Sequence, residues 1–332
     1  MRNTVTVLAI VFASLLTGAA DAADEQWVTH EGGEGPGKGK HIVFVTGDEE
    51  YRSEEGMPQL AKILARHHGF KTTVLFAINK ESGEIDTTQV DNIPGLEQLR
   101  DADLMVLFIR WRELPDEQMK HIMDYTNSGK PIIALRTATH PFMYRKDKAN
   151  PYAKWSSNSK DPQGGYGRAV LGETWVNHWG RHQVESTRGK IAPGMEDHSI
   201  VRGVGEIWGP SDVYEITTIH GDNVQPVIIG YVLKGMNPTD EINPEKKPMP
   251  VAWLRTYTGD QGKTARVFTT TMGHAGDLKD ENFRRLLVNA VYWLLDMEAP
   301  AKAKVDLVGE YDPVPIGFGK HRRGVKPADL KM

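Results

Sequence analysis

The stretch PIIALRTATHPF, residues 131–142, combines an apolar strand with a polar turn. Its first five residues carry no charge, which is typical of a strand that is covered on both faces of a sheet. The pattern then changes abruptly to Arg136-Thr137-Ala138-Thr139-His140, with a guanidinium group, two hydroxyl groups and an imidazole. Ligands of open α/β sheets bind outside the carboxyl ends of the strands. The stretch therefore predicts an α/β protein with a ligand site at this turn.

Polar clusters also follow other predicted strands. The further pairs of strand and cluster are 41–45 with Asp48–Glu55, 104–109 with Arg110-Trp111-Arg112, and 266–271 with 273–277. Strands and helices alternate through short turns, which predicts a doubly wound, mostly parallel sheet with helices on both faces. Because the carboxyl ends of parallel strands meet at one edge, we expect these clusters to form a single site.

Three amphipathic helices are expected. The first starts near Gly56, has Pro58 in its first turn and ends at Gly69. The second is opened by Pro115, and the third has its apolar face between residues 283 and 294. Further strand-like runs cover 213–217, 227–233 and 251–256.

Composition excludes several classes of protein. The 332 residues include 39% hydrophobic and 25% charged residues, as in a globular domain with a sizeable core. A net charge of −4 does not favour a nucleic-acid surface. The absence of cysteine excludes disulfides, a thiolate metal site and a cysteine nucleophile.

The first 22 residues have the pattern of a signal peptide. Arg2 precedes an apolar run from Val5 to Leu16, and Ala20-Asp21-Ala22 is a small-residue cleavage motif. We expect cleavage after Ala22 and export to the periplasm or the medium. The apolar run is too short to span a bilayer and no later segment is a candidate, so stable membrane insertion is not expected.

The remaining chain divides into four parts. Residues 23–39 form a Gly-rich leader, and residues 40–298 form the α/β domain. Within the domain, 143–172 is a polar insertion near the edge that carries the clusters. Residues 299–332 are a Pro- and Gly-rich tail that we expect to wrap the surface.

Several of these segments resemble one known family. Val251-Ala252-Trp253, the run Arg266 to His274 and the helix Phe283 to Trp293 resemble the C-terminal signature of ThuA-like (trehalose-utilisation) proteins. The 48–55 and 136–140 clusters resemble the exported version of that family, and the likeness covers roughly residues 40–298. It implies a flavodoxin-like, class I glutamine amidotransferase-like fold and a link to sugar metabolism.

The turn at Arg136-Thr137-Ala138 departs from the chemistry of that superfamily. The resemblance implies that relatives of this fold carry a cysteine nucleophile there, whereas this chain has none, so glutamine hydrolysis by a thiolate is excluded. Thr137 or Thr139 would need a base to replace it, and we expect these hydroxyls to bond the turn instead.

The clusters supply candidate catalytic and binding residues. His140, His274 and Glu49 are candidate acid–base groups, although for each histidine taken alone a hydrogen-bonded, partly buried position is the better explanation. Candidate substrate contacts are Asp48, Tyr51, Arg52, Arg110, Trp111, Arg112, Arg136, Thr137, Thr139 and Trp179. The alternative for the arginines and carboxylates is an ion-pair network, and for the aromatic residues it is packing.

A second pattern indicates a metal site. His178 and His182 are four residues apart, and Glu173 lies nearby. If the segment were helical, both imidazoles would share one face. Two nitrogen ligands and one oxygen ligand suit Zn²⁺ or a similar divalent ion. No other cofactor is indicated.

Three functions follow from these features. The first is an exported enzyme (a hydrolase, lyase or isomerase) acting on a carbohydrate or keto-sugar without a cysteine nucleophile. The second is a carbohydrate-binding protein without catalysis, because a fold does not fix a function. The third is a hydrolase that depends on a metal ion held by His178, His182 and Glu173.

Overall fold

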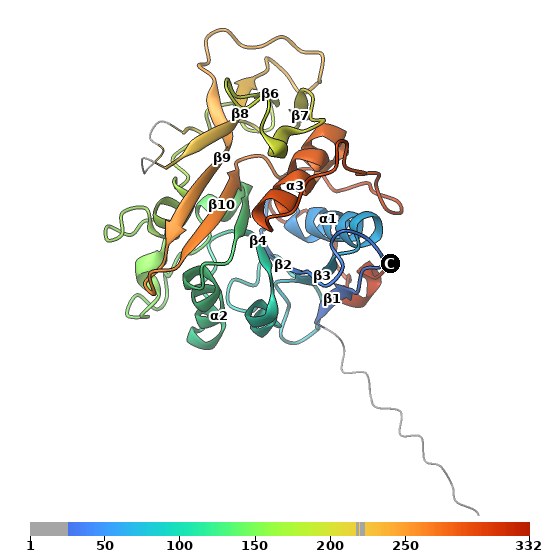
Figure 1. Ribbon diagram of the computed structural model, residues 1–332. Helices are drawn as coiled ribbons and strands as arrows, with labels where there is room; N and C mark the ends of the chain where they lie inside the picture. Colours follow the sequence, from blue (N-terminus) through green and yellow to red (C-terminus); the bar gives the residue numbers. More distant parts are fainter. Residues whose placement is uncertain (1–25, 217–218, 220–222) are drawn as a thin grey trace, which may run out of the picture.

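The computed structural model describes residues 26–216, 219 and 223–332, so the expected signal peptide lies outside the described residues. Ten strands form one sheet in the order β1-β3-β2-β4-β5-β10-β9-β8-β6-β7 (Figure 1). The strands are β1 Trp27–His30, β2 His41–Gly47, β3 Lys71–Leu75, β4 Leu104–Ile109, β5 Ile132–Leu135, β6 Thr187–Ile191, β7 Ile207–Gly209, β8 Gln225–Val232, β9 Met249–Thr258 and β10 Thr264–Thr270. The helices are α1 Ser53–His68, α2 Asp116–Asn127 and α3 Glu281–Leu294.

The sheet is mixed, and the α/β class is confirmed. Neighbouring strands from β3 through β10 are parallel, with Phe44 opposite Val106 and Phe268 opposite Ile133. From β10 onward the pairs are antiparallel, beginning with the β9–β10 hairpin. All six residues of β4 are buried, as its uninterrupted apolar run requires.

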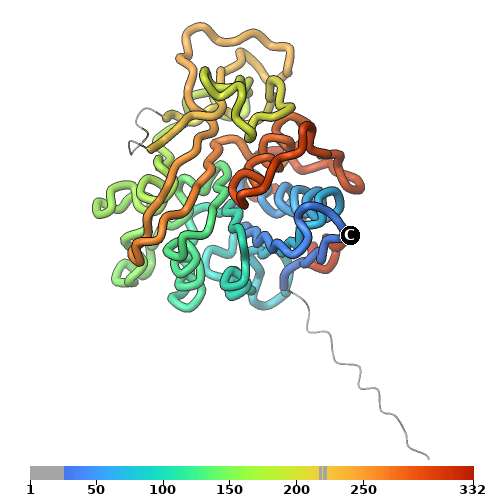
Figure 2. The backbone as a smooth tube through the Cα atoms, in the orientation of Figure 1, coloured from blue at the N-terminus to red at the C-terminus, as the bar shows by residue number. Residues whose placement is uncertain are grey.

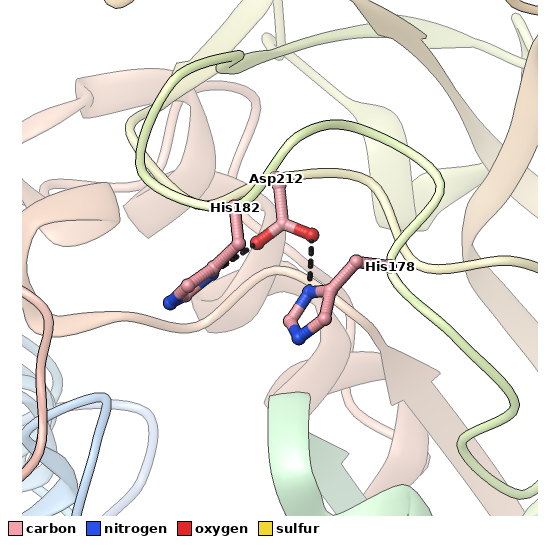
Figure 3. Close-up of side chains that lie close together, drawn as sticks. All are labelled: His178, His182 and Asp212. Atoms are coloured by element: carbon pink, nitrogen blue, oxygen red, sulfur yellow. Dashed lines mark hydrogen bonds and ion pairs between the residues drawn. The ribbon is translucent and has the colours of Figure 1, made fainter.

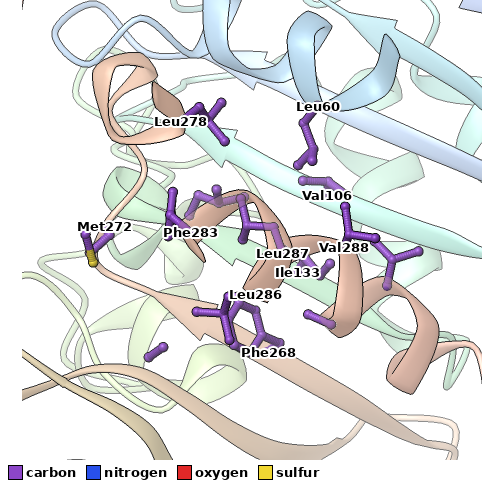
Figure 4. Packing of buried hydrophobic residues seen from close by; sticks show 14 of the residues in the cluster. Leu60, Val106, Ile133, Phe268, Met272, Leu278, Phe283, Leu286, Leu287 and Val288 are labelled. Carbon is purple, nitrogen blue, oxygen red and sulfur yellow. The ribbon is translucent and has the colours of Figure 1, made fainter. Parts of the chain in front are cut away.

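Helices cover both faces of the parallel part. Alternate residues of β2 point to opposite sides, so Ile42 and Phe44 pack with α1 and α3, whereas Val43 and Val45 pack with α2. Figure 4 shows the larger cluster, in which Leu287 of α3 lies close to Ile133. Burial of each such leucine or phenylalanine contributes about 1.5–3 kcal/mol.

The first helix differs from the expectation. It begins at Ser53 rather than near Gly56, so Pro58 lies in the second turn. The cause is the turn before it, where the Ser53 hydroxyl accepts hydrogen bonds from the backbone N–H groups of Gly47 and Asp48 at 3.2 and 3.1 Å. The predicted end is confirmed, since Gly69 adopts φ 78° and its N–H donates to Ala65.

Short strands outside the expected pattern extend the sheet. The expected leader, 23–39, contains β1, which pairs antiparallel with β3. The strands β6 and β7 were not predicted, whereas 213–216 forms only an isolated bridge, between Tyr214 and His178. Strands of three to five residues carry too little periodicity to be recognised.

The insertion and the tail both pack on the domain. Residues 143–172 contain the short helices η3 Ala153–Trp155 and η4 Gly167–Leu171, and Trp155, Tyr166 and Leu171 are buried in the cluster on the α2 face. The tail runs from α3 past α1 and ends beside β1, where η7 Pro327–Leu330 contacts that strand (Figure 2). Within the described ranges, none of the helices combines the length and apolarity that a bilayer span needs.

Candidate functional site

Three turns at the carboxyl ends of parallel strands contain strained residues. Arg52 follows β2, Trp111 follows β4 and Arg136 follows β5, with φ values of 63°, 48° and 47°. A left-handed conformation at a residue other than glycine costs about 1–3 kcal/mol and is common at functional sites. The strain therefore points to the same edge of the sheet that the sequence indicates.

Arg136 is the fully buried centre of this edge. Its Nη1 donates to the backbone oxygens of Asp212 and Thr271, at 2.6 and 2.7 Å. Its Nη2 donates to Asp212 Oδ1 at 2.7 Å and to the Tyr51 hydroxyl at 3.1 Å. The guanidinium also lies 3.6 Å from the Tyr214 ring centre and 4.4 Å from that of Tyr51. Arg136 thus positions Asp212 rather than presenting a free cation to a ligand.

Asp212 joins two histidines in what we call the Asp212 cluster: His178, His182 and Asp212. His178 Nδ1 lies 2.7 Å from Asp212 Oδ2, and His182 Nδ1 lies 3.0 Å from Oδ1 (Figure 3). Burial would raise the pKa of Asp212, but Arg136 and the two imidazoles hold it well below its usual range. The side chains of His178 and His182 are 29% and 22% exposed, so solvent reaches the cluster.

The two imidazoles have different hydrogen-bond partners. His182 Nε2 lies 3.1 Å from Glu50 Oε1, so this ring is held between two carboxylates. Burial lowers the pKa of His182, but the hydrogen bonds to Asp212 and Glu50 outweigh it and raise the pKa to about 9. For His178, no group in the described ranges bonds Nε2, which remains an acceptor when Nδ1 donates to Asp212.

The cluster can also hold a metal ion. One ligand atom from each of His178, His182 and Asp212 lies within 4.8 Å of the others. Glu173, expected as the third ligand, is elsewhere: its Oε1 accepts hydrogen bonds from Arg168 Nε and Nη2 at 3.0 and 2.9 Å. Residues 173–182 do not form a helix. The carboxylate beside the two imidazoles is therefore Asp212, whereas Glu173 was predicted because it is near them in the sequence.

His140 and His274 follow the adjacent parallel strands β5 and β10, as expected, but their contacts differ. His140 is buried with Nδ1 3.1 Å from the Thr139 hydroxyl, and its ring lies 5.6 Å from those of Trp111 and Trp175. Burial, then Arg110 and Arg136, lowers the pKa of His140 well below its usual value.

His274 has a structural contact. Its Nδ1 accepts from Gly276 N–H at 2.9 Å and so caps the short helix η6 Ala275–Lys279. Burial, with smaller effects of Arg136 and Arg52, lowers the pKa of His274 to about 3. Among the described residues no hydrogen bond links it to His140 or to the Asp212 cluster, so a shared ligand remains a prediction.

Glu49, Arg110 and Arg112 form an ion-pair network. The carboxylate of Glu49 binds Arg110 through one oxygen and Arg112 Nη2 through the other, the latter at 2.7 Å. Arg112 is fully buried and also donates to backbone oxygens. The guanidinium of Arg110 lies 3.8 Å from the Trp111 ring centre, and that of Arg145 lies 4.9 Å from it. This arrangement matches the ion-pair network that was the alternative to ligand binding for these residues.

Most of the remaining candidate residues form hydrogen bonds within the turns. Asp48 is buried and accepts from the Thr137 hydroxyl at 2.8 Å, and burial followed by Glu49 raises the pKa of Asp48. The Thr139 hydroxyl donates to the Arg136 carbonyl at 3.1 Å, as expected for a turn. Arg52 donates to the backbone oxygens of Glu49 and Gly317.

The Trp179 ring contacts residues outside the Asp212 cluster. Its Nε1 donates to the Lys247 carbonyl at 2.8 Å, and Lys246 Nζ lies 4.6 Å from the ring centre. Sequence analysis missed Asp212, Tyr214 and Glu50. The only local signal was the polar pair Ser211-Asp212 before an apolar run. Asp212 and Glu50 contact the histidines across long distances in the sequence, so their spacing does not reveal them.

Comparisons with known proteins give the following findings. The family model ThuA, described as trehalose utilisation, matches residues 40–294. A solved ThuA-like protein from Bacteroides uniformis is 13% identical, with a TM-score of 0.47 and coverage of 79% of this chain and 93% of that chain. Another, from Parabacteroides merdae, is 14% identical, with a TM-score of 0.49 and coverage of 88% and 99%. Among curated proteins there is no match.

Replacing Glu50 by Gln is expected to lower the pKa of His182 from about 9 towards 6.5, because one of its two carboxylate partners loses its charge. Histidine NMR titration measures this directly. The folded-state pKa of His182 is raised, so its contribution to stability is complete below pH 6.5 and is lost as pH rises through about 9. That loss, on the order of 3 kcal/mol, should shrink in E50Q.

The matched control is E206Q, which removes a surface carboxylate paired with Lys190 at 3.0 Å. It should leave the titration of His182 unchanged. The same His182 pKa in E50Q and wild type would contradict the assignment.

Proposed function

Because the chain belongs to the ThuA family, we propose that it is an enzyme of trehalose or related sugar utilisation that acts on a carbohydrate or keto-sugar at the Asp212 cluster. The observation that carries this proposal is the hydrogen-bonded array His178–Asp212–His182, which reaches solvent and leaves His178 Nε2 without a partner among the described residues. A carboxylate that orients an imidazole through Nδ1 makes its Nε2 an effective base.

The proposed step is proton transfer next to a sugar carbonyl. His178 Nε2 takes a proton from the hydroxyl-bearing carbon beside the carbonyl; the electron pair of that C–H bond forms the C=C bond, and the π pair of the carbonyl moves to its oxygen. The imidazolium of His182 donates to that oxygen its Nε2 proton, which faces Glu50 in the free protein, giving a neutral enediol. General acid–base catalysis of this kind contributes typically 10²–10⁴-fold to the rate. Arg136 has a positioning role, because its contacts fix Asp212.

A metal-dependent reaction is the second candidate. It is favoured by the ligand atoms of His178, His182 and Asp212, which lie within 4.8 Å of one another. A divalent ion at this position would replace the imidazole protons and would polarise a carbonyl or activate water. Two nitrogen ligands and a carboxylate oxygen suit Zn²⁺ or a similar ion.

The order of the parallel strands supports a finer description of the fold, and the absence of cysteine excludes one reaction class. We propose a flavodoxin-like, doubly wound arrangement, because the parallel strands have the order β3-β2-β4-β5-β10, which is 2-1-3-4-5 when numbered along the chain. The turn after β5 carries the strained Arg136, and the chain contains no cysteine. A thiolate mechanism is therefore excluded.

His178→Ala is expected to reduce turnover about 100-fold or more while sugar binding is retained, because the variant removes the proposed base. The assay follows trehalose, other disaccharides and their 3-keto derivatives by NMR, with binding measured by calorimetry. His121→Ala, on α2, is the matched control and should keep full turnover. Binding of a sugar without turnover by the wild type would instead favour the carbohydrate-binding alternative.

For the metal candidate, protein purified without chelators should contain about one divalent ion per chain, measured by mass spectrometry of the metal content. The ion should be lost in H178A and in D212A and retained in E173Q, because Glu173 pairs with Arg168. A wild type free of metal, or equal metal in all variants, would exclude this candidate.

We further propose that the protein is exported, on the basis of Arg2, the apolar run 5–16 and the motif Ala20-Asp21-Ala22. Expression in a bacterial host should yield a periplasmic or secreted product that begins at Ala23 in N-terminal sequencing. A cytoplasmic product that retains residues 1–22 would refute export.

A further inference from the structure

His140 has an unpartnered nitrogen beside the Asp212 cluster. Its side chain is buried, and its Nε2 forms no hydrogen bond with any described residue. Nε2 of His274 is both unpartnered and shielded from solvent, whereas Nε2 of His140 is unpartnered but not shielded. This nitrogen is therefore the part of the buried ring that a ligand can reach.

The turn after β5 fixes the proton of His140 on the other nitrogen. The Thr139 hydroxyl has one proton, which it donates to the Arg136 carbonyl at 3.1 Å. The same hydroxyl lies 3.1 Å from His140 Nδ1, so it accepts there and Nδ1 carries the hydrogen. In the neutral ring Nε2 is then an acceptor, and the lowered pKa of His140 keeps the ring neutral.

His140 and His178 share two aromatic neighbours. The Trp175 ring centre lies 5.6 Å from that of His140 and 5.7 Å from that of His178. The Tyr214 ring centre lies 6.3 and 5.5 Å from the same two imidazoles. Trp175 is half-buried, so part of its indole remains open next to both histidines. Such a surface suits the C–H face of a sugar ring, with the polar groups around it fixing the orientation.

The histidines at this edge have opposite hydrogen-bonding character. Nε2 of His140 is an acceptor, so it binds a hydroxyl group but not a carbonyl oxygen, which has no proton to donate. The raised pKa of His182 makes that ring a donor, which binds a carbonyl oxygen in the proposed step. A ligand that satisfies both rings has a hydroxyl group and a carbonyl group.

The arginines of the neighbouring turns are paired with carboxylates. The pairs are Arg52–Glu54, Arg110–Glu49, Arg112–Glu49 and Arg136–Asp212. A phosphate or carboxylate group on a ligand would have to displace one of these carboxylates, which would then lose its partner in a largely buried place. The turns therefore favour an uncharged ligand.

We propose that His140 binds a hydroxyl group of the substrate through Nε2 while the sugar ring packs on Trp175, and that the substrate is an uncharged hydroxyketone sugar. This inference rests on the proposed function of the Asp212 cluster. His140 holds and orients the sugar, whereas His178 and His182 transfer protons. A site built to bind a hydroxyl group discriminates strongly against analogues that lack it, so His140 also determines specificity.

The test is titration calorimetry of the H178A chain, which should bind a keto-sugar with little turnover. The probes are 3-ketotrehalose and its 2-O-methyl and 4-O-methyl ethers on the keto ring, in which one hydroxyl beside the carbonyl can no longer donate. One of the two ethers should bind about tenfold more weakly than the parent sugar. In H140F/H178A, which keeps an aromatic ring without Nε2, the parent should bind as weakly as that ether. H121F/H178A, changed on α2, is the matched control and should bind the parent as H178A does.

A second measurement needs no change at His140. In the H178A chain labelled with ¹⁵N-histidine, NMR should show hydrogen on His140 Nδ1 and none on Nε2. The Nε2 resonance should move upfield when 3-ketotrehalose binds, because the nitrogen then accepts a hydrogen bond. In the otherwise wild-type chain, H140F should raise KM about tenfold with little change in kcat, whereas H178A lowers kcat.

Three results would overturn the inference: equal affinity for the parent sugar and both ethers, an Nε2 resonance that carries hydrogen or does not respond to the sugar, and displacement of the sugar by inorganic phosphate. Failure of the proposed function looks different. The sugar would then bind with the expected dependence on His140, but the wild type would not turn it over.

Discussion

The buried ion pair between Arg136 and Asp212 holds the candidate site together. Both side chains are fully shielded from solvent, and the guanidinium satisfies Asp212 through its carboxylate and its backbone oxygen. Removing one partner of such a pair typically costs about 3–5 kcal/mol, because the other charge is left buried. The pair connects the turn after β5 with the loop after β7, so it joins the parallel half of the sheet to the antiparallel half. The positions of both imidazoles depend on this connection.

The sequence was most informative where local pattern and burial agree. The strand over 104–109 has its predicted limits because an uninterrupted apolar run has one stable environment, the centre of the sheet. The same reasoning located the turn at Arg136 and the helix that ends at Gly69. For β1, the surrounding Gly-rich composition concealed a four-residue strand that is defined by its pairing with β3.

The site was predicted only in part, for a physical reason. His178 and His182 were identified from their spacing, but the carboxylate between them comes from a loop 30 residues further on, and no periodicity marks it. Glu173 was predicted because it is near His178 in the sequence, but in the structure it pairs with Arg168. Spacing in the sequence does not identify residues that act through long-range contacts. The sequence does indicate the types of chemical group in the site, namely imidazole, carboxylate and guanidinium.

The tail contributes to the geometry of the candidate site through Gly317. Gly317 N–H donates to the Glu50 carbonyl at 3.0 Å, and the Gly317 carbonyl accepts from Arg52. A ribosome makes residue 317 long after residue 50, so the segment that carries Glu50 gains this support only after residue 317 has left the ribosome. A prematurely terminated product that stops before this point would lack the hydrogen bonds through which Gly317 supports Glu50 and Arg52.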